Sequence, residues 1–592
     1  MSWDAWLTLA VVTLMVAALA RDVVAPVLAV LGADIVLLVT GVIPAESAFS
    51  GFANPAPITV AALFIVARAV EKTGALQPLI ARTLGHRKAG RGALLRLLAP
   101  VAGASAFLNN TPIVAMLAPQ VADWAEKRGR STSPFLMPLS FATILGGMVT
   151  LIGTSTNLLV SGLMEAAGMA PLGMFEITRV GLPIALAGVV LLVALAPVLL
   201  PERRNARRQF EEDVREYVMS TVVAHGGPLD GQTVEAGGLR HLQGVFLAEI
   251  ERDGQMIAPA TPATLLRGGD RLTFVGRVDL VRDLQNLRGL VSTEHRHALG
   301  FDSADHTFFE AVVSGASPLV GKTLKEIQFR SRYQAAVVAI HRAGARVHAK
   351  LGTVRLKEGD TLLLVSDSEF GHRWRDRSDF LLVSHLGGTP PPSSRQALVV
   401  GLVTLGIVAL SGFGLLPILH AALIGAFTLL AARVLTPGEA RGAVNLDVVL
   451  IIGASFGIGA AVEHSGLAAV IANGVIQAAR AWGPGGVLVS ITIATIALTE
   501  LITNAAAAAL IFPIALATAG QMGLDARPFA IAVAIAASAS FLTPIGYQTN
   551  TMVYGLGGYR FGDYARLGTP LTILVILAIL LLVPVFWPLA AP

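Results

Sequence analysis

The sequence has no cysteine and few charged or aromatic residues: 14% of its 592 residues are charged and 6% are aromatic. Without cysteine, disulfide bonds, thiolate metal sites and cysteine nucleophiles are excluded, and the redox state of the compartment is left open. No HExxH motif and no complete Walker pattern occurs, so hydrolysis and ATP-driven transport have no support. The segment Gly321-Lys322-Thr323 ends like a phosphate loop, but Ala316 stands where that loop needs its first glycine.

Long apolar runs dominate the chain instead. Hydrophobic residues make up 54% of it and the mean hydropathy is +0.68, which predicts a polytopic α-helical membrane protein. The first apolar run, 3–20, lacks a basic n-region and is followed closely by a second, 24–43, so we interpret it as a retained helix. The net charge of +5 comes from Lys and Arg beside the apolar runs and gives no reason to expect nucleic acid as a partner.

The distribution of positive charge predicts the orientation in the membrane. Residues 44–57 and 165–178 connect predicted spans and contain no Lys or Arg, whereas nearly all the dense charge lies between residues 202 and 395. Because loops rich in Lys and Arg stay in the cytoplasm, the charged middle region is predicted to be cytoplasmic and the N-terminus outside. The parity of the spans places the C-terminus outside as well. The predicted location is a bacterial-type inner membrane.

Polar side chains interrupt one apolar segment near the start of the chain. The segment 106–119 reads AFLNNTPIVAMLAP, and its Asn109, Asn110 and Thr111 are costly at membrane depth unless they pair with protein, water or a carried solute. Ordinary interhelical hydrogen bonding is one such use, and a transport site is another. Basic clusters flank the stretch, so both of its ends are predicted to be cytoplasmic. Residues 92–126 are therefore predicted to form a re-entrant hairpin.

Two membrane halves, 1–200 and 396–592, carry the same kinds of interruption. In the first half the apolar run 135–164 is broken by IGTSTN and is predicted to be a helix with an unwound middle. In the second half, residues 485–520 carry TELITN and are predicted to form a hairpin. Residues 529–554 carry FLTPIGYQTN and are predicted to form the second broken helix.

Asparagines at the ends of these motifs pair across the two halves. Asn110 and Asn504 lie 394 residues apart, and Asn157 and Asn550 lie 393 apart. The first half is predicted to cross the membrane five times, so the second begins on the opposite face and the halves are predicted to be inverted repeats. Such folds place a binding site near the midplane, where helix N-termini face an anion and unwound carbonyl oxygens suit a hard cation. The first tip and first break contain no carboxylate, which favours an anion balanced by co-bound cations.

The charged middle region repeats itself at a spacing of 90 residues: SPLVGKTL follows GPLDGQTV, and KEGDTLLLVS follows RGGDRLTFVG. Alternating apolar runs around the Gly-Asp turn predict two compact α+β modules, 214–290 and 308–385. Both resemble the TrkA-C (RCK-C) domain of potassium channels and bacterial transporters. This resemblance implies a small-molecule regulator, and it leaves open an ion, a nucleotide-like messenger or no ligand. A basic linker, 201–213, and a Pro-rich linker, 386–395, join the modules to the membrane halves.

The membrane halves are similar to the divalent anion:sodium symporter family, whose members carry dicarboxylates, citrate or sulfate. That family has a Ser-Asn-Thr tripeptide at each hairpin tip and a Thr-Pro- or Gly-rich unwound loop in the partner helix. The resemblance implies a sodium site at each tip, substrate between the tips, an elevator-type movement and a homodimer. The implied substrate ligands are Asn109, Asn110, Thr111, Thr503, Asn504, Ala505, Thr156 and Thr549. The implied sodium ligands are Asn110, Gly153, Thr154 and Asn157 at site 1, and Asn504, Thr543, Gly546 and Asn550 at site 2.

The sequence departs from the family pattern at both tips. Asn109 stands in place of the first serine, and Thr503 and Ala505 replace serine and threonine, so the second tip lacks one hydroxyl. Two symmetric carboxylate receptors are therefore disfavoured, and sulfate is predicted ahead of a dicarboxylate. Glu500, four residues before Asn504, is interpreted as a residue that orients or tunes the second tip.

The predicted function is sodium-coupled symport, with sodium as the coupling ion, no other cofactor and no enzymatic activity. Two alternatives stay open at this point. A ligand-gated ion channel is suggested by the TrkA-C-like pair, although no TVGYG-like selectivity filter occurs. The other alternative is a sensor whose membrane part has lost transport.

Overall fold

The computed structural model describes residues 1–21, 24–75, 91–126, 128, 130–202, 218–239, 245–252, 255–257, 261–276, 290–292, 307–314, 317–342, 345–347, 351–366, 370–374, 379–385 and 394–590. Most of the two predicted linkers, 201–213 and 386–395, lies outside these residues. The chain divides into two compact units. One comprises Met1–Glu202, Pro391–Tyr554 and Tyr559–Pro592, and the other Arg203–Pro390 with Gly555–Gly558.

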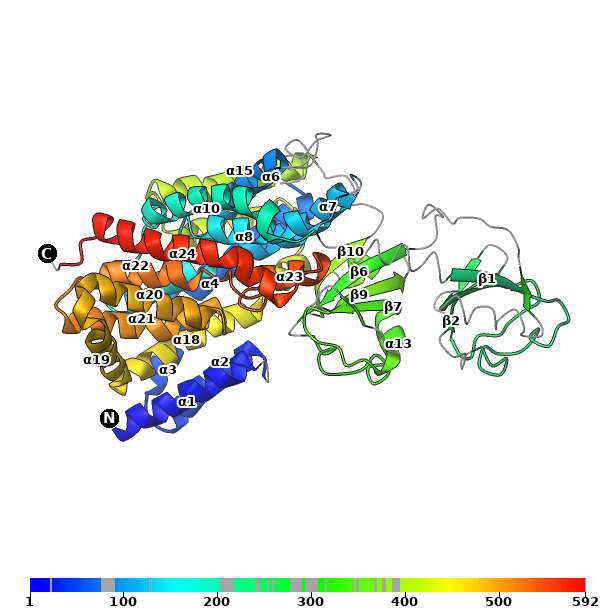
Figure 1. The fold of residues 1–592 in the computed structure, drawn as a ribbon, viewed down its shortest axis with the longest axis horizontal. Helices are drawn as coiled ribbons and strands as arrows, with labels where there is room; N and C mark the ends of the chain where they lie inside the picture. The colour runs from blue at the N-terminus through cyan, green and yellow to red at the C-terminus, as the bar shows by residue number, and fades with distance from the viewer. Residues whose placement is uncertain are drawn as a thin grey trace. The chain divides into compact units, whose positions relative to one another are not determined.

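The first half of the helical unit contains helices of very different lengths (Figure 1). Helix α4, Pro55–Thr73, has ends that its sequence dictates: the Asn54 side chain accepts a hydrogen bond from the Ala56 backbone N–H at 2.9 Å, and Gly74 ends the helix with φ of 60°. The other helices of this half are α1 (Trp3–Ala20), α2 (Pro26–Val39), α3 (Ala45–Ala53), α6 (Arg91–Ser105), α7 (Asn110–Glu126), α8 (Ser133–Gly147), α9 (Ser155–Ala166) and α10 (Thr178–Leu199).

The second half follows a similar order of elements. Two helices, a short helix and a long helix are followed by one further helix, by two pairs of helices and by a long closing helix. The short helices α3 and α17 are not anticipated from the sequence, because nine and seven residues are too few to show a clear apolar period. The helices of this half are α15 (Ser394–Gly412), α16 (Ile418–Ala431), α17 (Pro437–Ala443), α18 (Leu446–His464), α19 (Leu467–Ala479), α20 (Gly483–Thr499), α21 (Asn504–Gln521), α22 (Ala526–Ala537), α23 (Gln548–Leu556) and α24 (Phe561–Phe586).

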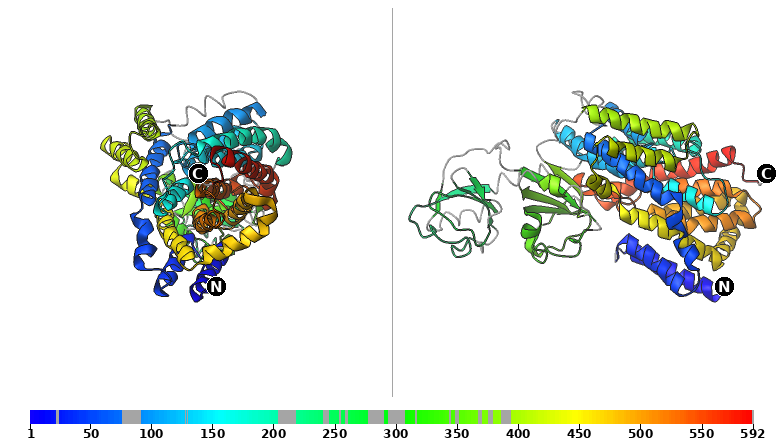
Figure 2. Two further views of the ribbon diagram at one scale, coloured as in Figure 1. Left: turned by 90° about the vertical axis from the view of Figure 1, so that its left-hand side faces the viewer. Right: turned by 180° about the vertical axis from the view of Figure 1, so that it is seen from behind.

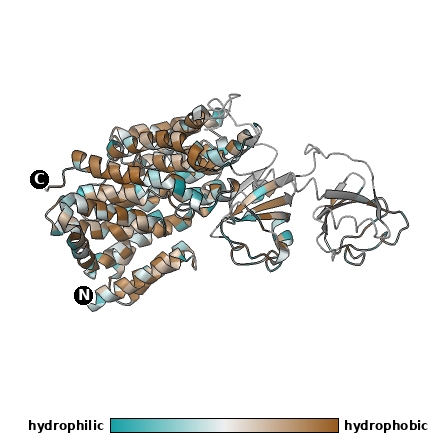
Figure 3. Ribbon diagram, in the orientation of Figure 1, coloured by the Kyte–Doolittle hydropathy of each residue, from teal (hydrophilic) through white to brown (hydrophobic). Residues whose placement is uncertain are grey.

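Seven helical stretches of the described chain are long and apolar enough to span a membrane. They are Trp3–Ala20, Ala45–Thr73, Thr178–Leu199, Arg395–Gly412, Leu446–His464, Asn504–Gln521 and Phe561–Phe586. Helices α8, α9, α22 and α23 have only 15, 12, 12 and 9 residues, against the roughly 20 that a full crossing needs. Apolar residues predominate along the helices (Figure 3), and the unit is that of a polytopic helical membrane protein.

Helices from the two halves pack against one another. Helix α4 contacts α15 and α16, α10 contacts α24, α21 contacts α9, and α18 contacts α2 and α3. Glycines on α18 permit close approach, because a Cβ atom at Gly453 would collide with the Phe52 ring and one at Gly457 with the Asp34 side chain. Figure 2 shows the halves interleaved, with both chain termini at the same end of the helical unit.

The other unit contains two five-stranded antiparallel sheets with the same strand order. The first module runs β3-β2-β4-β1-β5 and the second β8-β7-β9-β6-β10, so each strand of one has a counterpart in the other. The 90-residue sequence repeat is therefore also a repeat of structure, while the TrkA-C assignment stays a prediction. The elements are β1 (Val218–Val223), β2 (Val245–Arg252), β3 (Gln255–Ile257), β4 (Arg271–Gly276), β5 (Leu290–Ser292), β6 (Thr307–Val313), α13 (Phe329–Tyr333), β7 (Ala335–Arg342), β8 (Ala345–Arg346), β9 (Thr361–Ser366), α14 (Phe370–Trp374) and β10 (Phe380–His385).

An arginine–aspartate pair recurs in both modules. Arg252 of β2 binds Asp270 through two hydrogen bonds of 2.8 Å, and Arg342 of β7 binds Asp360 through two of 2.7 Å. Both aspartates are buried. Burial acts to raise the pKa of Asp270, but hydrogen bonds from Arg252 and from the Arg267 backbone N–H outweigh it and lower that pKa below its ordinary value. Each pair connects one strand, β2 or β7, to the turn that precedes the neighbouring strand of the sheet, β4 or β9.

We expect Asp270→Asn to loosen the first module and leave the second intact. Because the pKa of Asp270 is lowered in the folded state, its contribution to stability is fully present above about pH 4 and is lost as the pH falls through the folded value. At pH 7 the change should cost about 2 kcal/mol, roughly a 30-fold rise in locally opened protein. Limited proteolysis of the full-length protein, read by mass spectrometry within residues 218–292, measures this rise.

The matched control is Asp360→Asn, which should move the new cleavage to residues 307–385. Equal cleavage of the original protein and the Asp270→Asn variant at pH 7 would contradict the prediction.

Candidate functional site

The first hairpin tip is held by the side chain of Asn110. Helices α6 and α7 meet at residues 106–109, and Asn110 is the first residue of α7, buried at 2% exposure. Its Oδ1 atom lies 2.6 Å from the Ser105 hydroxyl, which itself lies 2.9 Å from the Thr143 carbonyl oxygen of α8. One hydroxyl therefore joins the tip to the partner helix.

The second hairpin tip has the same arrangement, with each residue 394 positions later. Asn504 is the first residue of α21, and its Oδ1 atom lies 2.8 Å from the Thr499 hydroxyl. That hydroxyl lies 2.7 Å from the Ala537 carbonyl oxygen of α22. The predicted pairing of Asn110 with Asn504 thus has a structural counterpart in the bonds that each asparagine makes.

The two breaks are bridged by asparagines in matching ways. Asn157 Nδ2 donates to the carbonyl oxygens of Gly147, at 3.3 Å, and Thr150, at 2.9 Å. These two bonds are repeated 393 residues later, where Asn550 Nδ2 donates to the carbonyl oxygens of Ser540, at 2.9 Å, and Thr543, at 3.2 Å. Carbonyl groups that lose their helical partners at a break thereby regain a donor.

Neutral oxygen atoms gather around Gly147 in the first half. A Cβ atom on Gly147 would lie 2.7 Å from Asn110 Oδ1 and 3.2 Å from the Gly153 carbonyl oxygen, so a side chain there would fill this space. Asn157 Oδ1 is buried and has no hydrogen-bond partner within the part of the chain that the structure describes. We call the oxygen atoms of these four residues the first oxygen cluster. A buried oxygen without a donor is costly, and a hard cation is one way to satisfy it.

Ser540 takes the place of Gly147 in the second half. Its hydroxyl oxygen lies 3.2 Å from the Thr499 carbonyl oxygen, 3.3 Å from that of Gly546 and 3.4 Å from Asn504 Oδ1. We call these four groups the second oxygen cluster. The second cluster differs in composition from the first, because it contains the hydroxyl of Ser540 at the position where the first half has Gly147.

Three hydroxyl residues of these clusters and tips are missed by reasoning from the sequence. Single serines and threonines in an apolar helix are usually bonded to their own backbone, so their presence alone carries little information. The available signal is the repeat: a hydroxyl occurs five residues before the tip asparagine in both halves. The missed residues are Ser105, Thr499 and Ser540.

Glu500 binds the unwound segment of the second half. Its Oε1 atom accepts hydrogen bonds from the backbone N–H groups of Phe541 and Leu542, both at 2.7 Å, and its Oε2 atom accepts one from Thr543 at 2.9 Å. The carboxyl group is buried at 5% exposure. The corresponding residue of the first half is Ala106, so this attachment exists in one half alone. The contacts give a physical form to the predicted orienting role.

Side chains also connect the halves across the centre of the unit. Tyr547, in the second break, accepts a hydrogen bond at its hydroxyl oxygen from Asn110 Nδ2 at 3.1 Å. The Ser140 hydroxyl of α8 lies 2.9 Å from the Thr549 hydroxyl and 2.8 Å from Asn550 Oδ1. Thr549, a predicted substrate ligand, thus pairs with Ser140 in this structure.

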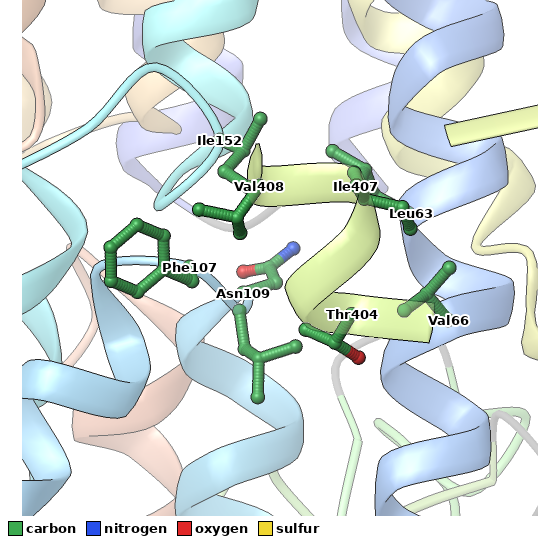
Figure 4. A pocket seen from close by; sticks show the side chains of 9 residues that line it. Leu63, Val66, Phe107, Asn109, Ile152, Thr404, Ile407 and Val408 are labelled. Atoms are coloured by element: carbon green, nitrogen blue, oxygen red, sulfur yellow. The ribbon is translucent and has the colours of Figure 1, made fainter. Parts of the chain in front are cut away.

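Asn109 lies apart from these bonds. Its side chain lines a small pocket formed by the first tip, the first break, α4 and α15 (Figure 4). Its predicted contact with substrate stays a prediction, because the surroundings of this amide are largely apolar here. The other lining residues are Leu63, Val66, Phe107, Leu108, Ile152, Thr404, Ile407 and Val408.

The remaining predicted residues lie at helix starts. Thr503 caps α21 by accepting a hydrogen bond from the Ala506 backbone N–H at 3.3 Å. Thr154 caps α9 by accepting one from Thr156 at 3.5 Å. Ala505 brings only a methyl group to the second tip. The first turns of α7, α9 and α21 therefore supply backbone N–H groups beside the tips and the first break.

Two hairpins, two broken helices and two clusters of oxygen atoms inside an apolar helical unit are the features of a polytopic membrane transporter. The CitMHS family model, described as citrate transporter, matches residues 7–536. The chain therefore belongs to this family of divalent anion:sodium symporters. The family predicted from the tips and breaks is confirmed.

Named relatives extend this comparison. A putative sulfur deprivation response regulator of Chlamydomonas reinhardtii is 36% identical over 93% of this chain and 96% of its own. An uncharacterized transporter of Synechocystis sp. is also 36% identical, over 93% of this chain and 92% of its own. Sodium/sulfate cotransporter 1 of C. reinhardtii is 25% identical over 89% of this chain and 83% of its own. Family members are transporters rather than enzymes.

We expect Glu500→Gln to release the second break locally. Glutamine offers one acceptor oxygen and turns an NH₂ group towards backbone donors, so at least one of the three bonds is lost. Charge-assisted bonds of this kind are worth about 1.5–3 kcal/mol, which corresponds to roughly 10- to 100-fold faster amide exchange. Hydrogen–deuterium exchange of a peptide that covers residues 538–547, in the purified full-length protein, measures the change.

Glu463→Gln, the same substitution at the exposed end of α18, is the matched control and should leave that peptide unchanged. Unaltered exchange in the Glu500→Gln variant would show that the carboxylate does not hold the break.

Proposed function

We propose that this protein is a sodium-coupled symporter of a divalent anion, with sulfate as the favoured solute and a dicarboxylate next. The observation that carries the proposal is the doubled arrangement of Asn110 and Asn504, each at the start of a helix and each beside an oxygen cluster. The backbone N–H groups at the N-termini of α7 and α21 can donate hydrogen bonds to an anion. The side-chain amide nitrogens of Asn110 and Asn504 add donors without adding charge.

The two oxygen clusters are the proposed sodium sites. Carbonyl, amide and hydroxyl oxygens are ligands that a hard cation accepts, and the first cluster offers an unbonded oxygen at Asn157. In the second cluster Asn504, Ser540 and Gly546 are the proposed ligands, with Thr543 held close by the Glu500 carboxylate. Two bound sodium ions offset the charge of a dianion, so the carried ions are together close to neutral when they cross the membrane.

The preference for sulfate has two supports. Relatives named sodium/sulfate cotransporters align with most of this chain. The tips are also chemically unequal, since Ala505 brings no hydroxyl where the first tip has Thr111. A compact tetrahedral dianion needs one binding centre, whereas a dicarboxylate needs two separated ones.

The movement and the assembly follow from the same reasoning. We infer that the halves are inverted repeats, that the hairpins move with their broken helices in an elevator-type cycle, and that the remaining helices form a homodimer. Support for the repeat comes from hydrogen bonds that recur at spacings of 393 or 394 residues, and the movement and the homodimer follow from the family resemblance. The sheet modules are the proposed cytoplasmic regulatory part, with both chain termini on the outer side.

Proteoliposomes containing the purified protein should accumulate labelled sulfate when an inward sodium gradient is imposed, and much less without one. Asn110→Ala and Asn504→Ala should each lower the initial rate by tenfold or more, because each removes the amide whose oxygen belongs to an oxygen cluster and whose bond joins the tip to the Ser105 or Thr499 hydroxyl. Labelled succinate tested in parallel ranks the two solutes. Uptake that does not depend on sodium would contradict sodium coupling. Uptake that is unchanged by both substitutions would contradict the assignment of the site.

A separate measurement addresses the first sodium site. Asn157→Ala removes the unbonded oxygen and the two bonds that hold the Gly147 and Thr150 carbonyl oxygens in place. It should raise the sodium concentration for half-maximal uptake by about tenfold or more, from the loss of at least roughly 1.5 kcal/mol of binding. Asn445→Ala, which removes a cap of α18 outside the clusters, is the matched control and should leave the sodium dependence unchanged. A sodium curve that does not move in the Asn157→Ala variant argues against this site.

A second function draws on the relative named a putative sulfur deprivation response regulator, which matches 93% of this chain. In this alternative the membrane part binds the anion without transporting it, and the sheet modules report occupancy. Sulfate-dependent thermal stabilisation of the purified protein without any sodium-driven uptake is the result that would favour it.

A further inference from the structure

Tyr547 makes a contact that links the two halves of the site. It lies in the second break, 393 residues after Thr154, so a phenol stands where the first half has a small hydroxyl side chain. Its hydroxyl oxygen accepts the hydrogen bond from Asn110 Nδ2 at 3.1 Å. The ring therefore extends from the second break to the first tip.

The backbone around Tyr547 fixes this direction. A Cβ atom on the preceding residue, Gly546, would lie 3.0 Å from the Ser540 hydroxyl and 3.1 Å from Glu500 Oε2, so the chain is pressed against the second oxygen cluster at this point. The Tyr547 carbonyl oxygen also accepts the Asn550 backbone N–H at 3.0 Å, at the start of α23. The phenol is thus carried by a constrained segment.

We propose that Tyr547 determines specificity: its ring takes the room that a second carboxylate would need, and its O–H donates to a tetrahedral oxyanion bound at the first tip. The inference rests on the proposed function, because it assumes that the anion binds between the tips. A phenol that accepts one bond from Asn110 still has a proton to donate, which supplies a hydroxyl of the kind missing at Ala505.

The consequence is a site that distinguishes solutes by shape. A sulfate-like dianion has all its oxygens around one atom and can use Asn110, Thr111 and the phenol together. A succinate-like dianion has a second charged end, and placing it against the aromatic ring would leave that carboxylate without donors. Sites with buried polar groups that match one solute reject a poor match by large factors, because the unmatched groups stay unpaired.

Two substitutions separate the two roles of the side chain. In Tyr547→Phe the ring stays and the O–H is lost, so the KM for sulfate should rise about tenfold or more while succinate stays excluded. In Tyr547→Thr the side chain becomes that of the first half, so the KM for sulfate should rise and succinate should become a competitor and a transported solute. Tyr554→Phe, on α23 and in ring contact with Tyr564, is the matched control and should leave both properties unchanged.

The experiment uses full-length protein in proteoliposomes with a sodium gradient, and it measures the KM for labelled sulfate and its inhibition by selenate and by succinate. In the original protein selenate should inhibit and a 100-fold excess of succinate should not. If the Tyr547→Thr variant fails to fold, the KM of Tyr547→Phe decides the matter. An unchanged KM in Tyr547→Phe would overturn the inference.

The wild-type result separates this inference from the proposed function. Import of succinate as readily as sulfate by the original protein would overturn the role of Tyr547 and leave divalent-anion symport standing. Import of neither solute would remove the proposed function, and the inference with it.

Discussion

Backbone carbonyl and hydroxyl groups at membrane depth need partners inside the protein, and four asparagine side chains provide such partners here. Asn157 and Asn550 donate to carbonyl oxygens freed by the two breaks, while Asn110 and Asn504 accept from hydroxyl groups at the tips. Without Asn157 and Asn550, the short helices would end in unpaired carbonyl groups within an apolar unit. The same bonds keep carbonyl and amide oxygens gathered at the breaks, so the bonds that pair the backbone groups also hold the oxygen clusters together.

The shared frame carries two different local chemistries. The first oxygen cluster is built around glycines and retains an unbonded oxygen, whereas the second contains the Ser540 hydroxyl and lies beside the Glu500 carboxylate. A carboxylate near one cluster and not the other gives the two clusters different electrostatic surroundings. The second break is also the more firmly held of the two by side chains, because three of its backbone N–H groups bind one buried acid.

Much of the helical unit could be predicted from the sequence, because asparagine and glycine are easily recognised as interruptions of apolar runs. The predicted hairpin 92–126 coincides with α6 and α7. The spacing of Asn110 and Asn504 identifies two residues that make matching hydrogen bonds. The orientation of Asn109 towards α4 and α15, and the reach of Tyr547 to the first tip, depend on how distant segments approach each other. No local sequence pattern encodes how distant segments pack together. Helices α3 and α17 are too short to show a clear apolar period.

The recurrence of the asparagine bonds also has a historical meaning. We infer that one ancestral half was copied, and that selection then kept in both copies the groups that mend the breaks. Groups outside this set differ between the two halves. Each half can therefore serve as a reference for the other, because matched positions of the two halves carry different residues in the same backbone setting. Three such positions are Ala106 with Glu500, Gly147 with Ser540, and Thr154 with Tyr547.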